Sequence, residues 1–139
     1  MRFEQTKEYK DIDILPEQEK YISSMDKINK ALQQEKNYGF NIYIEEYKVG
    51  FILLRQFSHD SFFLWDYIID RKFQNKGYGI YALIKFLDFL RKEFCAKVVT
   101  TTYIWGNEHA KYIYEKIGFI ETDVVDEDGI HEVNLKITL

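Results

Sequence analysis

The chain has 139 residues, 46% hydrophobic and 30% charged, so we expect an ordered globular domain rather than a disordered chain. Its formal net charge of −4 argues against nucleic acid or an anionic membrane as the partner and mildly favours a cationic one. No run approaches the roughly 20 apolar residues of a membrane span, and the first residues hold no apolar secretory segment. We therefore expect a single cytoplasmic domain over residues 1–139, with a composition rich in Lys, Ile, Tyr, Asn and Phe that is typical of an AT-rich bacterial genome.

The first half of the chain predicts helices followed by antiparallel strands. Pro16 suits a helix start, and Glu17–Gln34 predicts one or two helices. One side of these helices carries the apolar residues Tyr21, Ile22, Met25, Ile28 and Leu32. Asn41–Glu46 and Val49–Phe57 predict two strands joined by a hairpin turn, and Phe62–Asp70 predicts a third strand.

Helical and strand patterns then alternate. Apolar residues recur at helical spacing from Ile80 to Leu90, and the breadth of that apolar face is typical of a helix lying on a sheet. The lone Cys95 at the end of this pattern is most simply a small core residue, since no nearby motif supplies a base for a nucleophile. Lys97–Trp105 is β-branched and aromatic, which predicts a strand. Asn107 can cap a further helix, and Gly118 is placed to end it.

The chain closes with two predicted strands, Phe119–Val125 and His131–Ile137. Asp128-Gly129 between them favours a tight hairpin turn. The predicted order is helix, three antiparallel strands, helix, strand, helix and a closing hairpin. That order predicts an α/β domain with a mixed central sheet and flanking helices.

The stretch QNKGYG, Gln74–Gly79, places two of the seven glycines of the chain at the mouth of a predicted helix. Gly77 and Gly79 could be simple turn residues where a strand hands over to a helix. A dinucleotide fingerprint is disfavoured, because six residues separate the preceding strand from Gly77 and the next strand offers no acid for a ribose. A third interpretation is a pyrophosphate cradle. Glycines let backbone N–H groups approach a phosphate, the helix N-terminus adds a partial positive charge, and Lys76 adds a full one.

No metal site is expected. His59, His109 and His131 are too scattered to form a ligand set. The segment DEDGIHE lacks the spacing of a calcium loop. We read both features as surface or turn residues.

Two motifs together resemble the GNAT superfamily of acyl-CoA N-acyltransferases. QNKGYG fits the acyl-CoA signature (Q/R)-x-x-G-x-(G/A) of that family. Downstream, WGNEHAKYIYEKIGF resembles its N-x-x-A-x-x-x-Y-x-x-x-G-F segment, with these residues in register: Asn107, Ala110, Tyr114, Gly118 and Phe119. The resemblance covers the chain from about Ile42 to the end. More weakly, LPEQEKYISS is similar to the opening helix of bacterial spermine/spermidine acetyltransferases, with Gln18, Tyr21 and Ile22 as the matching positions.

The resemblance implies a GNAT fold, in which the fourth strand, here ending DYIID, splays from its parallel neighbour, the fifth, to admit pantetheine. It also implies a cytoplasmic acetyl-CoA-dependent N-acetyltransferase in which an amine attacks the thioester directly. Members of the family are commonly dimers, so a homodimer is open. The implied cofactor-binding residues are Tyr67, Ile69, Gln74, Asn75, Lys76, Gly77, Tyr78, Gly79 and Asn107. Among them, the Ile69 amide could also polarise the thioester carbonyl.

The resemblance further implies that Tyr114 protonates the departing thiolate. By its apolar spacing alone, Tyr114 could equally be a core residue, and Asn107 could be only a helix cap. The general base that takes the proton of the amine stays open among Glu45, Glu46, Asp60 and Asp66, which lie on or near the central strands.

The acceptor implied by the resemblance is the primary amine of a small molecule, and polyamines such as spermidine are the preferred candidates. The similarity of the opening helix and the acidic net charge favour them. Two alternatives stay open. The acceptor could be a protein N-terminus, an aminoglycoside or an amino-acid amine, or the chain could be a non-catalytic acyl-CoA-binding regulatory module.

Overall fold

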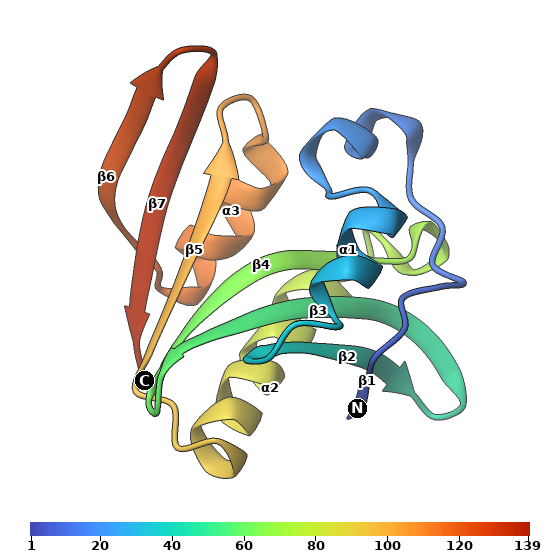
Figure 1. Cartoon of the computed structure of the whole chain (residues 1–139). Helices are drawn as coiled ribbons and strands as arrows, with labels where there is room; N and C mark the ends of the chain where they lie inside the picture. The colour runs from blue at the N-terminus through green and yellow to red at the C-terminus, as the bar shows by residue number, and fades with distance from the viewer.

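The structure, a computed structural model that describes all residues 1–139, is built on one mixed seven-stranded β-sheet (Figure 1). The strands are β1 (Arg2–Thr6), β2 (Asn37–Ile44), β3 (Tyr47–Ser58), β4 (Ser61–Ile69), β5 (Val98–Ile104), β6 (Ile120–Glu127) and β7 (Ile130–Thr138). The helices are α1 (Met25–Ala31), α2 (Tyr78–Glu93) and α3 (Glu108–Ile117), with 3₁₀ turns η1 (Pro16–Tyr21) and η2 (Arg71–Phe73). None of the helices combines the length and apolar character needed to cross a bilayer.

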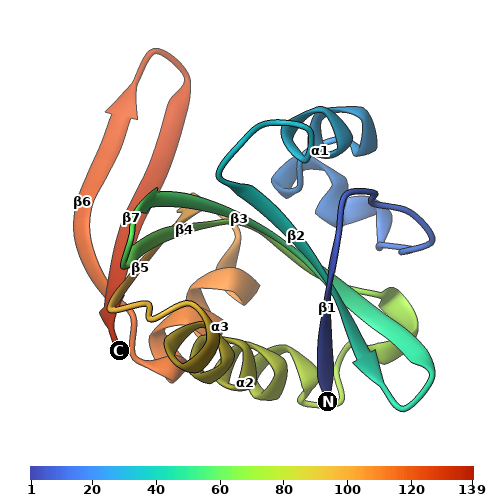
Figure 2. The same cartoon turned by 60° about the horizontal axis from the view of Figure 1, so that its bottom comes forward.

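The strands lie in the order β1-β2-β3-β4-β5-β7-β6, and every neighbouring pair is antiparallel except β4 and β5. Helices α2 and α3 cover one face of the sheet, while η1 and α1 lie on the other (Figure 2). The predicted α/β fold with a mixed sheet and flanking helices is therefore confirmed. The element order predicted from the first helix onward is confirmed as well.

Strand β1 was not predicted. It pairs antiparallel with β2, from Arg2 opposite Tyr43 to Thr6 opposite Gly39. Its sequence RFEQT has one large apolar residue, so the alternation that identifies a half-buried strand is missing. Phe3 supplies the tertiary contact instead, because its ring packs 5.1 Å from that of Phe86 on α2.

Two hydrophobic clusters hold the layers together. The larger one lies between the sheet and helices α2 and α3, and the rings of Phe40, Phe86 and Phe94 meet in it mainly edge to face. The smaller one lies under the N-terminal segment, where Ile28 and Leu32 of α1 pack on the opposite face of the sheet. The larger cluster is what fixes α2 and α3 against the strands.

Strands β4 and β5 separate part-way along their length. Their pairing runs only from Ser61 opposite Val98 to Leu64 opposite Thr101. On the other side of β4, Leu64 and Asp66 face consecutive residues of β3, so Trp65 is an extra residue, a β-bulge. Beyond the bulge, β4 stays paired with β3 as far as Ile69 but has no partner toward β5. The predicted splay of the fourth and fifth strands is confirmed.

Two predictions of burial were wrong. Cys95 is exposed, in a left-handed conformation with φ of 56° just after α2 ends, and the next residue, Ala96, occupies the buried position. Met25 is also exposed, because it is the first residue of α1 and the buried side of that helix begins at Ile28.

Candidate active site

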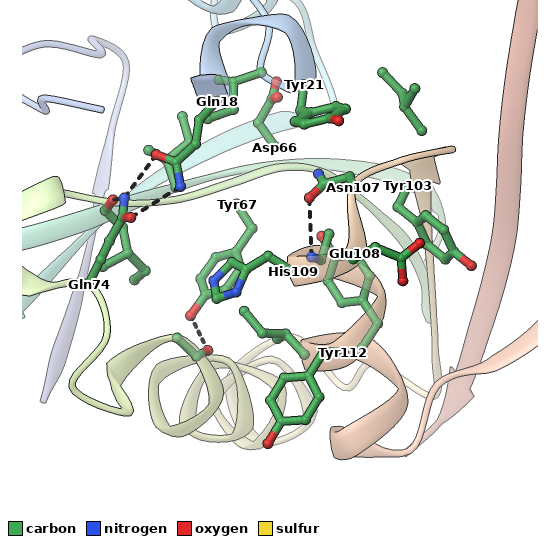
Figure 3. Close-up of a pocket in the computed structure, with 18 of the residues that line it drawn as sticks. Gln18, Tyr21, Asp66, Tyr67, Gln74, Tyr103, Asn107, Glu108, His109 and Tyr112 are labelled. Carbon is green, nitrogen blue, oxygen red and sulfur yellow. Dashed lines mark hydrogen bonds between the residues drawn. The ribbon is translucent and has the colours of Figure 1, made fainter. Parts of the chain in front are cut away.

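A cavity of about 690 Å³ opens where β4 and β5 separate (Figure 3). Its walls come from the end of β4, the loop before α2, the end of β5, the first turns of α3, and the segment that includes η1. Most of the predicted cofactor-binding residues line it: Tyr67, Ile69, Gln74, Asn75, Gly77, Gly79 and Asn107. Tyr114 lines it too, whereas Lys76 and Tyr78 lie outside the lining, with Lys76 exposed.

One end of the cavity is the N-terminus of α2. Asn75 and Gly77 are both left-handed, with φ of 59° and 83°, and Tyr78 is the first helical residue. The N-cap Gly77 has no side chain to accept a hydrogen bond, and the first backbone hydrogen bond of the helix is from the Tyr81 N–H to the Gly77 carbonyl. The preceding N–H groups of α2 are therefore available to an anion, where the helix dipole and Lys76 add positive charge.

The two glycines of the loop have different structural reasons. Gly77 needs its left-handed backbone, while a Cβ there would meet nothing within 4 Å. A Cβ on Gly79 would lie 3.2 Å from Ile113 Cδ1, so this glycine also lets α2 and α3 pack closely. A simple turn therefore explains why residue 77 is glycine, through its left-handed backbone, but does not explain the glycine at position 79.

The free edge of β4 presents backbone donors to the cavity. The Asp70 N–H donates to the Val49 carbonyl, which leaves Ile69 and Tyr67 at the alternate positions, with backbone groups directed away from β3. The Ile69 carbonyl accepts from Gln74 Nε2 at 2.8 Å, but its N–H stays available. The Tyr67 hydroxyl donates to the Gly79 carbonyl at 2.5 Å, which ties this strand edge to the first turn of α2 (Figure 3).

The side chain of Gln74 is engaged within the protein. Its amide forms reciprocal hydrogen bonds with the amide of Gln18, at 3.0 and 3.1 Å, in addition to the bond to Ile69. A cofactor contact by this side chain would have to compete with these bonds. The hydrogen bonds of Gln74 hold the start of the loop against Gln18 and Ile69, so its predicted role in cofactor binding includes positioning the loop.

Helix α3 places Asn107 and Tyr114 on the far wall. Asn107 is the N-cap, and its Oδ1 accepts from the Ala110 N–H at 3.2 Å, so the capping interpretation is confirmed while Nδ2 has no partner in the protein. Tyr114 is 7% exposed and packs 5.4 Å from the ring of Phe119, after the turn at Gly118. It is a core residue that also faces the cavity.

Burial raises the pKa of the Tyr114 phenol to about 12, although a hydrogen bond with Thr101 opposes the rise and the charge of Asp66 adds to it. The phenol therefore keeps its proton throughout the neutral range. It can act as a hydrogen-bond donor toward the cavity.

Asp66 is the only one of the four candidate bases that lines the cavity. Glu45 and Glu46 lie in the turn between β2 and β3, and Asp60 lies in the turn between β3 and β4. Asp66 is 6% exposed; its Oδ1 accepts from the Ser23 N–H at 3.1 Å, and its Oδ2 is buried without a partner. Burial raises the pKa of this carboxyl, while the Ser23 N–H and the charge of Lys27 oppose the rise. A buried carboxyl with a raised pKa in a cavity is a candidate for proton exchange with a ligand.

Several cavity residues were not singled out from the sequence: Glu17, Lys20, Tyr103, Glu108 and His109. Glu108 and His109 are at unspecified positions of the N-x-x-A segment, and Glu17 and Lys20 precede any motif. Glu108 and His109 could have been found from their place next to Asn107, and Glu17 and Lys20 from their place next to Gln18 and Tyr21; no motif position lies close to Tyr103.

Residues 1–120 match the acetyltransferase (GNAT) domain family. The chain belongs to the GNAT family of acetyltransferases. Membership confirms the resemblance and the enzyme class, an acetyl-CoA-dependent N-acetyltransferase. No curated protein matches the sequence significantly.

Solved structures support the GNAT fold. A GNAT family acetyltransferase from Elizabethkingia anophelis with acetyl-CoA bound is 18% identical, with a TM-score of 0.71 over 99% of this chain and 98% of that one. Spermidine N-acetyltransferase from Vibrio cholerae in complex with CoA and spermine is 21% identical, with a TM-score of 0.68 over 84% and 76%. A dodecameric structure of spermidine N-acetyltransferase from that organism is 19% identical, with a TM-score of 0.66 over 83% and 74%.

The raised pKa of Asp66 predicts that this carboxylate costs the GNAT domain stability at neutral pH. A group whose pKa is raised on folding stabilises the folded state only when protonated, so stability falls as pH rises from the ordinary carboxyl range through the raised value. Asp66→Asn keeps an acceptor for the Ser23 N–H and removes the charge. We expect it to unfold at higher urea concentration than the wild type at pH 7.5, by an amount that shrinks toward about pH 4.

Asp128→Asn, in the exposed turn between β6 and β7, is the matched control. Its difference from the wild type should not follow this trend. An Asp66→Asn gain that is equal at both pH values, or a loss at pH 7.5, would contradict a costly buried charge.

Proposed function

We propose that the protein transfers the acetyl group of acetyl-CoA to a primary amine of a small molecule, with a polyamine such as spermidine as the preferred acceptor. One observation carries the proposal. A single cavity runs from the uncapped N-terminus of α2, past the free edge of β4, to Tyr114 and the unpartnered carboxylate of Asp66. N–H groups that can bind an anion, N–H groups on a free strand edge, and the ionisable side chains of Tyr114 and Asp66 thus line the same cavity.

The cofactor half of the site uses mainly backbone groups. The N–H groups at the start of α2, including those of Tyr78 and Gly79, together with Lys76 would hold the pyrophosphate. The free N–H groups of Tyr67 and Ile69 would pair with the pantetheine arm as a neighbouring strand does, and Asn107 Nδ2 could donate to one of its carbonyls. When bound, acetyl-CoA supplies an activated thioester. The proposal uses no metal.

The residues at the other end of the cavity have complementary tasks. Oδ2 of Asp66 would accept the proton that the amine loses, directly or through water. The Ile69 N–H would donate to the carbonyl oxygen as negative charge develops there. The Tyr114 hydroxyl would donate its proton to the sulfur as the carbon–sulfur bond breaks, which gives an amide and the free thiol of CoA. The proton on Asp66 would then leave to water and Tyr114 would regain one from water, which restores the starting state.

The charges that line the cavity support a cationic acceptor. Glu17 and Glu108 line it with Asp66, against the single cation Lys20. The likeness to the spermidine N-acetyltransferase that was solved with spermine points the same way, at 21% identity. Assembly as a homodimer stays a prediction.

The cofactor half is tested at Lys76. Lys76→Ala removes one positive charge beside the N-terminus of α2 and breaks no side-chain hydrogen bond or salt bridge, so we expect weaker binding of acetyl-CoA, by about two- to tenfold. The affinity for acetyl-pantetheine, which lacks the pyrophosphate, should not change. Isothermal titration calorimetry measures both, and Lys85→Ala on the outer side of α2 is the control. An equal loss of affinity for acetyl-CoA and acetyl-pantetheine would contradict a contact between Lys76 and the pyrophosphate.

The proton donor is tested with Tyr114→Phe. The substitution keeps the ring that packs on Phe119 and removes only the hydroxyl. We expect kcat to fall about 10²- to 10⁴-fold while acetyl-CoA affinity is retained, because the anion cradle lies on another helix. A thiol-release assay gives the rates. Tyr112→Phe, an exposed tyrosine on the same helix, is the control, and wild-type turnover by Tyr114→Phe would leave this residue with its packing role alone.

The acceptor is tested with a panel of amines. We expect polyamines to have the highest kcat/KM, and that value to fall as salt rises, because the attraction between Glu17, Glu108 and a polycation is screened. The double substitution Glu17→Gln and Glu108→Gln should lower kcat/KM for polyamines by about two- to fivefold. Glu127→Gln, on β6, is the control. Faster acetylation of an aminoglycoside, an amino-acid amine or a peptide N-terminus would replace the polyamine proposal with that acceptor.

A further inference from the structure

The acceptor side of the cavity is walled by the segment 13–23, here called the acceptor arm. Six of its residues line the cavity: Leu15, Glu17, Gln18, Lys20, Tyr21 and Ile22. Its only regular structure is the 3₁₀ turn η1, which contains no buried residue. Outside the turn, Ile14 and Ile22 pack against the smaller hydrophobic cluster, so the turn itself, with Gln18, is the part of the arm that polar attachments hold in place.

Those attachments all lead to β4 or to the segment that follows it. The Asp13 N–H donates to Asp70 Oδ2 at 3.1 Å, and the Arg71 N–H donates to the Asp13 carbonyl at 2.8 Å. At the other end of the arm, the Ser23 N–H donates to Asp66 Oδ1. The third attachment lies between these two and joins Gln18 to Gln74.

The pair of amides formed by Gln18 and Gln74 is fully reciprocal (Figure 3). Each amide donates through Nε2 to the Oε1 of the other. Gln18 Oε1 also accepts from the Leu15 N–H at 3.1 Å, and Gln74 Nε2 also donates to the Ile69 carbonyl at 2.8 Å. The pair thus connects the arm, the last residue of β4 and the first residue of the loop that leads into α2.

The arm reaches across the cavity as well as along it. A Cβ built on Gly106, in the loop between β5 and α3, would lie 3.3 Å from the Tyr21 hydroxyl. Tyr21 is three residues beyond Gln18 and two before Ser23, whose N–H orients Asp66. A displacement of Gln18 would therefore also move the Tyr21 ring, which lies beside Gly106, and the Ser23 N–H, which binds Asp66.

We propose that Gln18 is a positioning residue for the acceptor, which holds the acceptor arm to the cofactor loop through Gln74. The inference rests on the proposed function, because it assigns cofactor to the Gln74–Gly79 loop and acceptor to the space under the arm. Binding at the loop and ordering of the arm are then linked, and the linkage is reciprocal. Acetyl-CoA should tighten acceptor binding, and loss of the amide pair should uncouple the two.

The first measurement needs only the wild-type protein. Hydrogen exchange of residues 13–23 is followed by mass spectrometry with and without saturating acetyl-CoA, after calorimetry has shown that the cofactor binds. We expect acetyl-CoA to slow exchange in the arm by about fivefold or more, in addition to slowing it at the start of α2. Protection at α2 with an unchanged arm would overturn the inference and leave the proposed function standing. Absence of acetyl-CoA binding would overturn the proposed function itself.

The second measurement uses Gln18→Met, Gln74→Met and the double variant. Methionine keeps the length of the side chain and removes the amide. We expect Gln18→Met to abolish the cofactor-dependent protection of the arm and to raise the acceptor KM about fivefold or more, with acetyl-CoA affinity within about twofold of the wild type. Because both substitutions break the same pair, the double variant should have the acceptor KM of Gln74→Met alone.

Gln5→Met, on the edge strand β1 and outside the cavity, is the matched control for adding an apolar side chain. Additive effects of the two substitutions on the acceptor KM would show that Gln18 and Gln74 act separately and would overturn the inference. So would a Gln18→Met variant in which acetyl-CoA still protects the arm.

Discussion

The separation of β4 from β5 after Leu64 and Thr101 is the constraint on which the site depends. A strand edge that faces the protein interior without a partner leaves backbone donors unsatisfied, which is costly unless a ligand or water completes them. The gap nevertheless does not need the ligand to stay open. β3 holds β4 as far as Ile69, and β7 holds β5 along its whole length to Ile104, so neither strand relies on the other. The result is a stable slot with the hydrogen-bonding pattern of a missing strand.

The bulge at Trp65 comes directly after the last residue of β4 that pairs with β5, and it changes which side chains of β4 face each side of the sheet. Before it, Leu64 packs in the cluster under α2; after it, Tyr67 reaches α2 and Ile68 packs under α1. Asp66 follows the bulge directly and is buried on the arm side with one oxygen unpartnered. The extra residue thus lies where the slot begins and is followed by a buried carboxyl with an unpartnered oxygen, a feature that we expect to cost stability.

The parts that the sequence predicted are those defined by local backbone. The turn and helix start at Gly77, the cap at Asn107 and the stop at Gly118 follow from neighbouring residues, and the structure places them as expected. The parts that it did not predict depend on residues far apart in the chain. Of the four acids only Asp66 reaches the cavity, because it lies on β4 beside the slot whereas the other three lie in turns, and Gln18 meets Gln74 across 56 positions. β1 is a strand only because β2 offers it an edge.

The same distinction divides the two halves of the site. In the proposed site, the cofactor half would recognise its ligand mainly through backbone donors, so glycine positions and a helix start are enough to indicate it. The proposed acceptor half consists of side chains on the arm and of Asp66, which hydrogen bonds connect to β4 and its loop. Side chains can be exchanged there without disturbing the slot, because η1 buries nothing. On the proposed assignment, cofactor binding and choice of amine are thus carried by separable parts of one cavity, joined where Gln18 contacts Gln74.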